Sequence, residues 1–289
     1  MKRRFVNLLL ILTMLAGLCV FLYPTAADAW NQHTQSRAIT GFREALEALP
    51  QEDLEPMWED ALDYNRQLRQ NTFSGDAFTD GDTDGADSLY RSLLNPQGSG
   101  IMGYLSIPKI DQKLPLYHGV SQGVLQVAAG HMSGTSLPVG GSGTHCVIAA
   151  HRGLPSARLF TDLDRLEPGD TFYLHILDRV LAYRVDRILP MVEKNDYAAL
   201  NEALQIIPGE DHVTLFTCTP YGINSHRLLV RGIRTEYLGE EDPVGEVPAE
   251  SMVRFVPAEG AYRLLLLSAL SLAGVLIAGL LRKKRRKHP

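Results

Sequence analysis

The sequence has few cysteines: three in 289 residues. Cys19 lies in an apolar N-terminal run, where we expect it to pack as an apolar residue. Only Cys146 and Cys218 remain for the rest of the chain. A small secreted scaffold held together by disulfides needs a larger, closely spaced set, so that class of fold is excluded.

Patterns that would hold a metal or a nucleotide are also missing. The histidines show no zinc spacing. Asp80-Gly-Asp82-Thr-Asp84-Gly85 matches the first half of a calcium loop, but the twelfth position is Arg91 where a bidentate Glu is required. Gly98–Gly103 satisfies G-x-G-x-x-G, yet no strand precedes it and no helix follows it. We therefore predict a solvated acidic loop, no metal and no cofactor.

Basic charge is concentrated at the two ends of the chain. Lys2, Arg3 and Arg4 precede an apolar run over 5–23, and the uncharged run over 264–281 is followed by six basic residues. Eighteen helical residues span about 27 Å, near the lower limit for crossing a membrane. Because each basic cluster lies on the terminal side of its apolar run, we predict two membrane-spanning ends with both termini in the cytoplasm. Ala27-Asp28-Ala29 fits a cleavage site, so the first span is either retained or removed.

The region between these spans is poor in basic residues. Without the nine terminal basic residues, 19 Lys and Arg face 33 Asp and Glu, a balance of −14. Such a domain is a poor match for nucleic acid or for an acidic surface.

Changes in composition divide the chain into segments. Amphipathic periodicity indicates two helices separated by Pro50, and 101–237 alternates short apolar runs with Gly/Pro turns. Seven or eight short strands with short inserted helices, such as 198–204, predict a mainly β fold closed into a barrel. The predicted segments are a signal or membrane segment (1–29), a helical segment (30–70), an acidic loop (71–99), the barrel (100–237), a linker (238–260) and a membrane helix with a basic tail (261–289).

A strand ending in a thiol is followed closely by an arginine. Thr214–Cys218 reads as a strand, and Arg227 lies at the start of the next apolar run. A hairpin with 219–226 as its loop puts Cys218 directly opposite Arg227, with both side chains on one face. A cation beside a thiol favours the nucleophilic thiolate. Cys218 is therefore the predicted nucleophile.

A histidine occupies the same kind of position. The apolar run from Cys146 ends at His151, just before Arg152-Gly153, so His151 is predicted at a strand end as an acid–base group. The plain alternative is that His151 caps a strand. Cys146 lies five positions earlier and should face away as a buried apolar residue. A Cys146–Cys218 bridge is a second alternative, and it would consume the nucleophile.

These segments resemble sortases. The resemblance rests on Thr214–Cys218, Cys218–Arg227, Gly130–Gly141 and Ala150–Phe160, and it is strongest with the class C, pilin-polymerising group. It implies a closed sortase-type β-barrel on the outer face of a Gram-positive cell membrane. It also implies a cysteine transpeptidase, of the thiol peptidase class of hydrolases, with Cys218, His151 and Arg227 at the catalytic positions.

The resemblance also implies the substrates. Sortases cleave an LPxTG-like sorting signal of a pilin or surface-protein precursor between Thr and Gly through a thioester. Class C members pass the acyl group to a lysine amine of another pilin during pilus assembly. A housekeeping sortase using a cell-wall precursor amine, a cysteine peptidase using water and a non-enzymatic surface-assembly module are the alternatives.

Class C sortases typically cover the site with a lid anchored by Asp-Pro-aromatic. The nearest equivalent here is Thr79-Asp80-Gly81-Asp82, with Gly in place of Pro, and the lid candidates are Phe78, Asp80, Asp82 and Tyr90. A Gly-rich charged lid should be mobile and should occlude weakly. Deleting 76–87 is therefore expected to leave thiol labelling of Cys218 nearly unchanged.

Overall fold

The computed structural model describes residues 2–68, 77–78 and 88–239. The chain separates into two compact units, Met1–Glu246 and Val247–Pro289, and the described residues all belong to the first. The predicted C-terminal membrane helix and most of the predicted linker lie outside the described residues.

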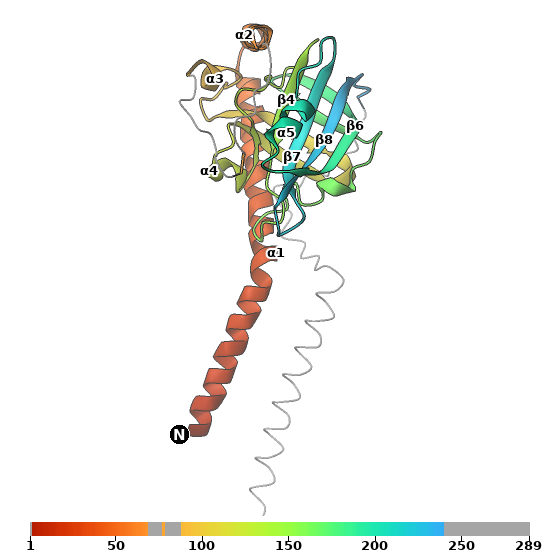
Figure 1. The fold of residues 1–289 in the computed structure, drawn as a ribbon. Helices are drawn as coiled ribbons and strands as arrows, with labels where there is room; N and C mark the ends of the chain where they lie inside the picture. The colour runs from red at the N-terminus through yellow and green to blue at the C-terminus, as the bar shows by residue number, and fades with distance from the viewer. Residues whose placement is uncertain (1, 69–76, 79–87, 240–289) are drawn as a thin grey trace, which may run out of the picture. The chain divides into compact units, whose positions relative to one another are not determined.

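The regular elements are five α-helices, two 3-10 helices and eight strands within the described residues (Figure 1). The α-helices are α1 (Lys2–Ala48), α2 (Gln51–Gln67), α3 (Ser88–Ser92), α4 (Gln122–Leu125) and α5 (Tyr197–Ala203), and the 3-10 helices are Pro108–Ile110 and Leu163–Arg165. The strands are β1 (Ile101–Ile107), β2 (Gln112–His118), β3 (Ala129–His131), β4 (Thr144–Ala149), β5 (Thr171–Ile176), β6 (Arg179–Glu193), β7 (Asp211–Thr219) and β8 (His226–Thr235).

The eight strands close into one barrel in the order β1-β2-β3-β4-β7-β8-β6-β5. The pairs β2–β3 and β4–β7 are parallel, and the others are antiparallel. Antiparallel pairing of β1 with β5 closes the sheet and removes its edges. The predicted mainly β barrel is confirmed, and α5 lies within one residue of the predicted inserted helix.

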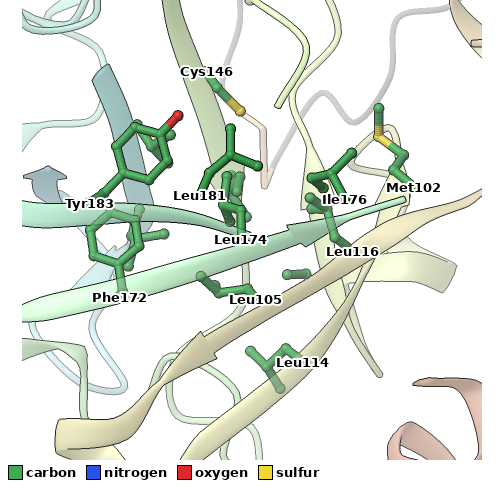
Figure 2. Close-up of a cluster of buried hydrophobic side chains, with 14 of the residues drawn as sticks. Met102, Leu105, Leu114, Leu116, Cys146, Phe172, Leu174, Ile176, Leu181 and Tyr183 are labelled. Atoms are coloured by element: carbon green, nitrogen blue, oxygen red, sulfur yellow. The ribbon is translucent and has the colours of Figure 1, made fainter. Parts of the chain in front are cut away.

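Alternation along the strands builds two apolar clusters. In β4, Cys146 and Ile148 join the main core, while Val147 and Ala149 join a second cluster on the other face of the sheet. The main core is drawn in Figure 2, where Cys146 lies among Met102, Leu105, Leu174, Ile176 and Leu181. Each such aliphatic side chain stabilises the fold by about 1.5–3 kcal/mol when fully buried. Cys146 thus faces the core, as its odd separation from His151 predicted.

The second apolar cluster covers the outer face of the barrel where β4, β7 and β8 adjoin. It is formed by residues from these strands, from α5 and from neighbouring segments: Ala77, Val120, Leu125, Met132, Val147, Ala149, Leu200, Ala203, Leu204, Phe216 and Leu229. We call it the outer cluster. It matters for function because the predicted nucleophile lies at its margin.

The N-terminal helix is continuous from Lys2 to Ala48 and runs through the boundary predicted between residues 29 and 30. Residues 4–17 of this helix are exposed, and its second half buries Gln35, Ile39 and Phe42. The predicted break at Pro50 is present, because proline has no N–H to continue the helix. By length and composition alone, α1 could cross a membrane, a test that a signal sequence passes equally.

Two histidines are buried as neutral imidazoles. His131 Nε2 lies 2.9 Å from the Ser136 carbonyl, and its Nδ1 lies 2.9 Å from the Tyr90 hydroxyl. His145 is held at 2.9 Å from the Gln205 carbonyl and 2.8 Å from the Thr214 hydroxyl. Burial lowers the pKa of each imidazole to about 4. Protonation of either ring therefore opposes folding.

This burial predicts acid lability. The unfolded chain binds these protons near pH 6.5, whereas the folded chain binds them only near pH 4, so stability is full above about 6.5 and falls as the pH drops. Between about pH 7 and pH 5 we expect a loss of about 2 kcal/mol per histidine. Denaturant unfolding at several pH values measures it.

The control is His145→Gln, whose fall in stability over this pH range should be smaller by one histidine's share. An equal slope in both proteins would contradict the assignment.

Candidate active site

The strand register pairs the thiol with the guanidinium. In the antiparallel β7–β8 ladder Cys218 lies directly opposite Arg227, as predicted, although the strands extend one residue further and leave 220–225 as the loop. Cys218 is 4% exposed and Arg227 is 2% exposed. Because side chains alternate, both share the outer face with Phe216 and Leu229.

The predicted histidine is brought to the same end of the barrel by the parallel β4–β7 pair. The ladder aligns Ala149 with Phe216, and beyond the last residue of β4 the Ala150 amide donates to the Phe216 carbonyl at 3.2 Å. The Thr217 hydroxyl donates to the Ala150 carbonyl at 2.7 Å. Extending this register by two residues from Ala149 and Phe216 aligns His151 with Cys218 on the outer face.

Local electrostatics differ between the two basic groups. Burial lowers the pKa of His151 below its ordinary value, so the imidazole resists protonation. Arg227 Nη1 donates to the carbonyls of Asn224 at 3.0 Å and His226 at 2.8 Å. These bonds fix the guanidinium against the hairpin loop. The neutral His151 imidazole and the fixed Arg227 guanidinium therefore lie on either side of β7, the strand that carries Cys218.

An aromatic side chain covers this face. The Phe78 ring lies 5.2 Å from the His151 ring and stacks on Phe216 at 5.8 Å, measured between centroids. The Arg227 guanidinium carbon lies 5.3 Å from the Phe78 centroid. Phe78 is held by a hydrogen bond from Gln122 to its carbonyl at 3.1 Å and by the buried Ala77.

These contacts argue against the expectation of a weakly occluding loop, which the labelling experiment below tests. Two apolar residues, Ala77-Phe78, dock in the outer cluster although the surrounding sequence is polar and Gly-rich. The two residues that cover the site, Ala77 and Phe78, therefore precede the Thr79–Asp82 stretch that the sequence suggested as the anchor of the lid. The other candidates there, Asp80 and Asp82, lie outside the described residues.

Tyr90, the remaining lid candidate, belongs to the core instead. It is 1% exposed, and its hydroxyl contacts His131 Nδ1 at 2.9 Å and accepts from the Gly119 amide at 3.0 Å. A buried phenol needs such partners, and the barrel provides them. Tyr90 thus ties α3 to the barrel and does not cover the site.

Arg152 links the two strand ends, a role that no sequence pattern predicted. Its Nη1 donates to the Thr219 hydroxyl at 3.3 Å, and its Nη2 forms an ion pair with Asp164. The residue after His151 is thereby tied to the residue after Cys218. Adjacency to His151 was the one available signal, and it does not reveal the partner.

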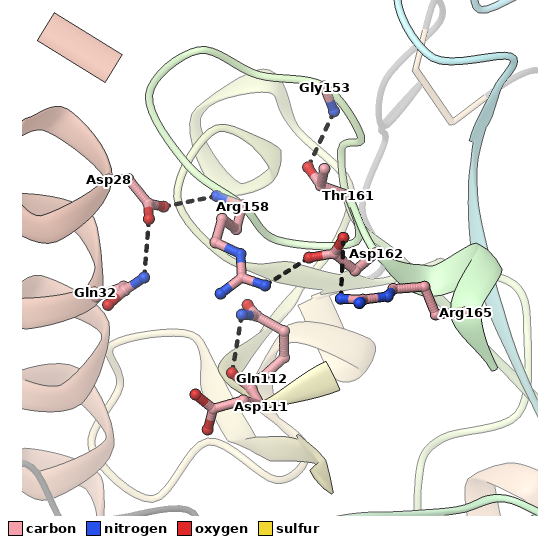
Figure 3. Close-up of polar contacts among 9 residues, drawn as sticks. All are labelled: Asp28, Gln32, Asp111, Gln112, Gly153, Arg158, Thr161, Asp162 and Arg165. Carbon is pink, nitrogen blue, oxygen red and sulfur yellow. Dashed lines mark hydrogen bonds and ion pairs between the residues drawn. The ribbon is translucent and has the colours of Figure 1, made fainter. Parts of the chain in front are cut away.

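The loop after His151 is also held by α1 (Figure 3). Asp28 accepts a hydrogen bond from the Arg158 amide at 2.8 Å. Outside the residues drawn there, Asn31 donates to the Ser156 carbonyl at 2.6 Å. Within the loop, the Gly153 amide donates to the Thr161 hydroxyl at 3.2 Å. The helix that carries the apolar N-terminal run thus supports the loop next to the candidate acid–base group.

The contacts of Phe78 predict an occluded thiol. Phe78 is partly buried, so removing its ring should cost less than the about 3–5 kcal/mol of a fully buried Phe, yet a loss of about 1.4 kcal/mol in lid closure already exposes the thiol tenfold more often. In a Cys19→Ser, Cys146→Ala background, where Cys218 is the one cysteine, Phe78→Ala should raise the rate of labelling by a charged thiol reagent about tenfold or more. An unchanged rate would restore the expectation of a weakly occluding loop.

Comparisons with known proteins agree with this geometry. The family model described as the sortase domain matches residues 105–235. Sortase C from Streptococcus pneumoniae is 46% identical, with a TM-score of 0.61, and the match covers 70% of this chain and 97% of that one. Sortase C1 from Streptococcus agalactiae is 43% identical, with a TM-score of 0.61, over 70% of this chain and 99% of that one.

A more distant relative is sortase SrtE1 from Streptomyces coelicolor, which is 28% identical over 142 residues. That match covers 46% of this chain and 40% of the relative, so the chain spans less than half of that protein. The match to the family model, the closed barrel and the near-complete coverage of two class C structures lead to one conclusion. The chain belongs to the sortase family of transpeptidases and resembles its class C members.

Proposed function

We propose that this chain is a membrane-anchored, pilin-polymerising sortase. It cleaves an LPxTG-like sorting signal between Thr and Gly and transfers the acyl group to a lysine amine of another pilin. One observation carries the proposal. Cys218 pairs with Arg227 across β7 and β8, and the parallel β4–β7 register, extended by two residues, aligns His151 with the same end of β7. The S. pneumoniae relative, described by its pilin substrate specificity, supports the substrate class.

The first half of the reaction forms a thioester. The Cys218 thiol gives its proton to the neutral His151, and the sulfur attacks the Thr carbonyl carbon. Arg227 stabilises the oxyanion that forms or orients the substrate. Because its Nη1 is anchored to two backbone carbonyls, the guanidinium does not reorganise as charge develops, a contribution of about 3 kcal/mol.

Loss of the amine completes the thioester, and the second half of the reaction then transfers the acyl group. The His151 imidazolium gives its proton to the departing Gly amine as the peptide bond breaks, which leaves the thioester on Cys218. The incoming lysine amine then attacks the thioester carbonyl, and the neutral His151 takes the amine proton. The sulfur leaves and recovers that proton, which returns the enzyme to its starting state.

The surroundings favour an amine over water as acceptor. The site lies at the margin of the apolar outer cluster. An apolar surface beside the thioester limits the access of water and so limits hydrolysis of this reactive intermediate. The exposed apolar part of α1 supports an N-terminal membrane anchor. The basic residues at both ends of the sequence favour two cytoplasmic termini, with the catalytic domain on the outer face of a Gram-positive membrane.

Intact-mass analysis of the full chain in detergent tests the thioester. With a sorting-signal peptide, we expect an adduct of the peptide up to Thr that hydroxylamine removes, because thioesters react with it. Cys218→Ala should abolish the adduct, while the matched control Cys146→Ala should retain it, because Cys146 faces the core. An adduct in Cys218→Ala would contradict the assignment.

The acceptor is tested in the same assay. A lysine-bearing pilin segment should outcompete both water and a cell-wall precursor amine for the trapped thioester. Release to water alone would indicate a peptidase, and preference for the cell-wall amine would indicate a housekeeping sortase. No thioester at all, with surface assembly intact, would indicate a non-enzymatic role.

The hydrogen bond from Thr217 predicts a specific kinetic defect. Thr217→Val leaves the Ala150 carbonyl without this donor and loosens His151, so kcat should fall about 100-fold, as expected for a misplacement of about 1 Å. Thr214→Val is the control, since it loses an equally buried hydroxyl bond, to His145, on the same strand. Both variants should lose a similar amount of folding stability, about 1–3 kcal/mol. Only Thr217→Val should also show the fall in kcat. Equal kcat values in the two variants would contradict the alignment.

A further inference from the structure

The β7–β8 loop beside Cys218 exposes two large apolar side chains. Tyr221 is 59% exposed and Ile223 is 71% exposed. The loop is a tight turn in which the amides of Ile223 and Asn224 both donate to the Pro220 carbonyl at 3.0 Å. Small polar residues usually occupy the tip of such a turn. An exposed apolar pair at this position indicates a surface that contacts something apolar.

The position of this loop is fixed by a series of contacts to α1. A Cβ placed on Gly153 would lie 3.1 Å from the Tyr221 ring, so the ring packs on Gly153. Gly153 belongs to the loop that Asp28 and Asn31 of α1 hold (Figure 3). The turn therefore lies against the loop that is bonded to the first polar residues of α1.

The contacts between α1 and the loop lie shortly after the end of the apolar run of α1. The apolar run of α1 ends at Tyr23, and at 1.5 Å per residue Asp28 lies about 7.5 Å and Asn31 about 12 Å further along. The headgroup layer on each side of a bilayer is about 5–7 Å thick. Tyr23 and Trp30 are 59% and 72% exposed, and such aromatic residues are enriched at membrane interfaces.

We propose that the turn 220–224 rests on the membrane surface, with Tyr221 and Ile223 among the lipid headgroups. The proposal rests on the membrane anchoring of α1 in the proposed function. A lipid surface fits better than a protein partner, because the apolar run of α1 places the outer edge of the headgroup layer only a few ångströms below these contacts, within the reach of an exposed Tyr or Ile side chain. Residues 219–225 carry no charge, so their insertion requires no desolvation of an ion.

Docking of the turn would determine where the substrate reaches the thiol. The turn joins the strand of Cys218 to the strand of Arg227, so docking of the turn places the catalytic end of the barrel at the bilayer surface. A peptide chain held in the membrane would then present its adjacent residues directly to the thiol. Because the binding is apolar, the acidic character of the domain does not oppose it on uncharged lipids.

Quenching of tryptophan fluorescence by brominated lipid tests the proposal. The full chain is placed in phosphatidylcholine vesicles, with or without bromine near the headgroup end of the acyl chains. Ile223→Trp in a Trp30→Phe background reports the turn. Leu238→Trp in the same background is the matched control, because Leu238 is 76% exposed and follows the far end of β8, about 30 Å away.

Bromine should quench Ile223→Trp at least about twofold more than Leu238→Trp, given insertion of about 5–10 Å. Equal quenching of the two variants, or none at position 223, would overturn the docking proposal. Tyr23→Trp in the same Trp30→Phe background reports the anchoring, because Tyr23 ends the apolar run of α1 and Trp58 is buried. Quenching of the Tyr23→Trp variant without quenching of the Ile223→Trp variant refutes the docking alone, whereas no quenching of the Tyr23→Trp variant refutes the anchoring as well.

Discussion

The hydrogen bond from the Thr217 hydroxyl to the Ala150 carbonyl is the contact on which the site depends. At 2.7 Å it continues the parallel β4–β7 register beyond the last residue of β4, where a ladder would otherwise fray. His151 follows Ala150 and Cys218 follows Thr217, so this side-chain bond helps to align the proposed acid–base group with the proposed nucleophile. The Arg152–Thr219 bond ties the next pair of residues in the same way.

The paired strands β4 and β7 are held rigidly on their inner face and are shielded from water on their outer face. The main core fixes β4 and β7 from within, while the outer cluster and the Phe78 ring cover the face on which Cys218, Arg227 and His151 lie. The same cover lowers the pKa of His151, because a buried imidazole resists charge. In the proposed mechanism, Phe78 must therefore move before a peptide can reach the sulfur.

Local patterns in the sequence predicted the features that depend on strand geometry. The spacing of Cys218 and Arg227 defines a hairpin pair, and the odd separation of Cys146 from His151 turns Cys146 into the core. Features that depend on contacts between distant segments were not predictable in this way. Phe78 and Tyr90 were equally good lid candidates from the sequence. Contacts with distant residues distinguish them, because Phe78 packs on the outer cluster whereas Tyr90 is buried beside His131.

The central claim is that the Cys218 sulfur attacks a carbonyl whose oxygen Arg227 receives and whose leaving amine His151 protonates. A crystal structure of the full chain bearing a sorting-signal peptide trapped covalently through its Thr carbonyl carbon tests this most directly. We predict a bond to Cys218 Sγ, the peptide oxygen within hydrogen-bonding distance of the Arg227 guanidinium, the His151 ring on the leaving-group side and Phe78 displaced. A peptide bound with its oxygen directed away from Arg227, or with His151 out of reach, would contradict the account.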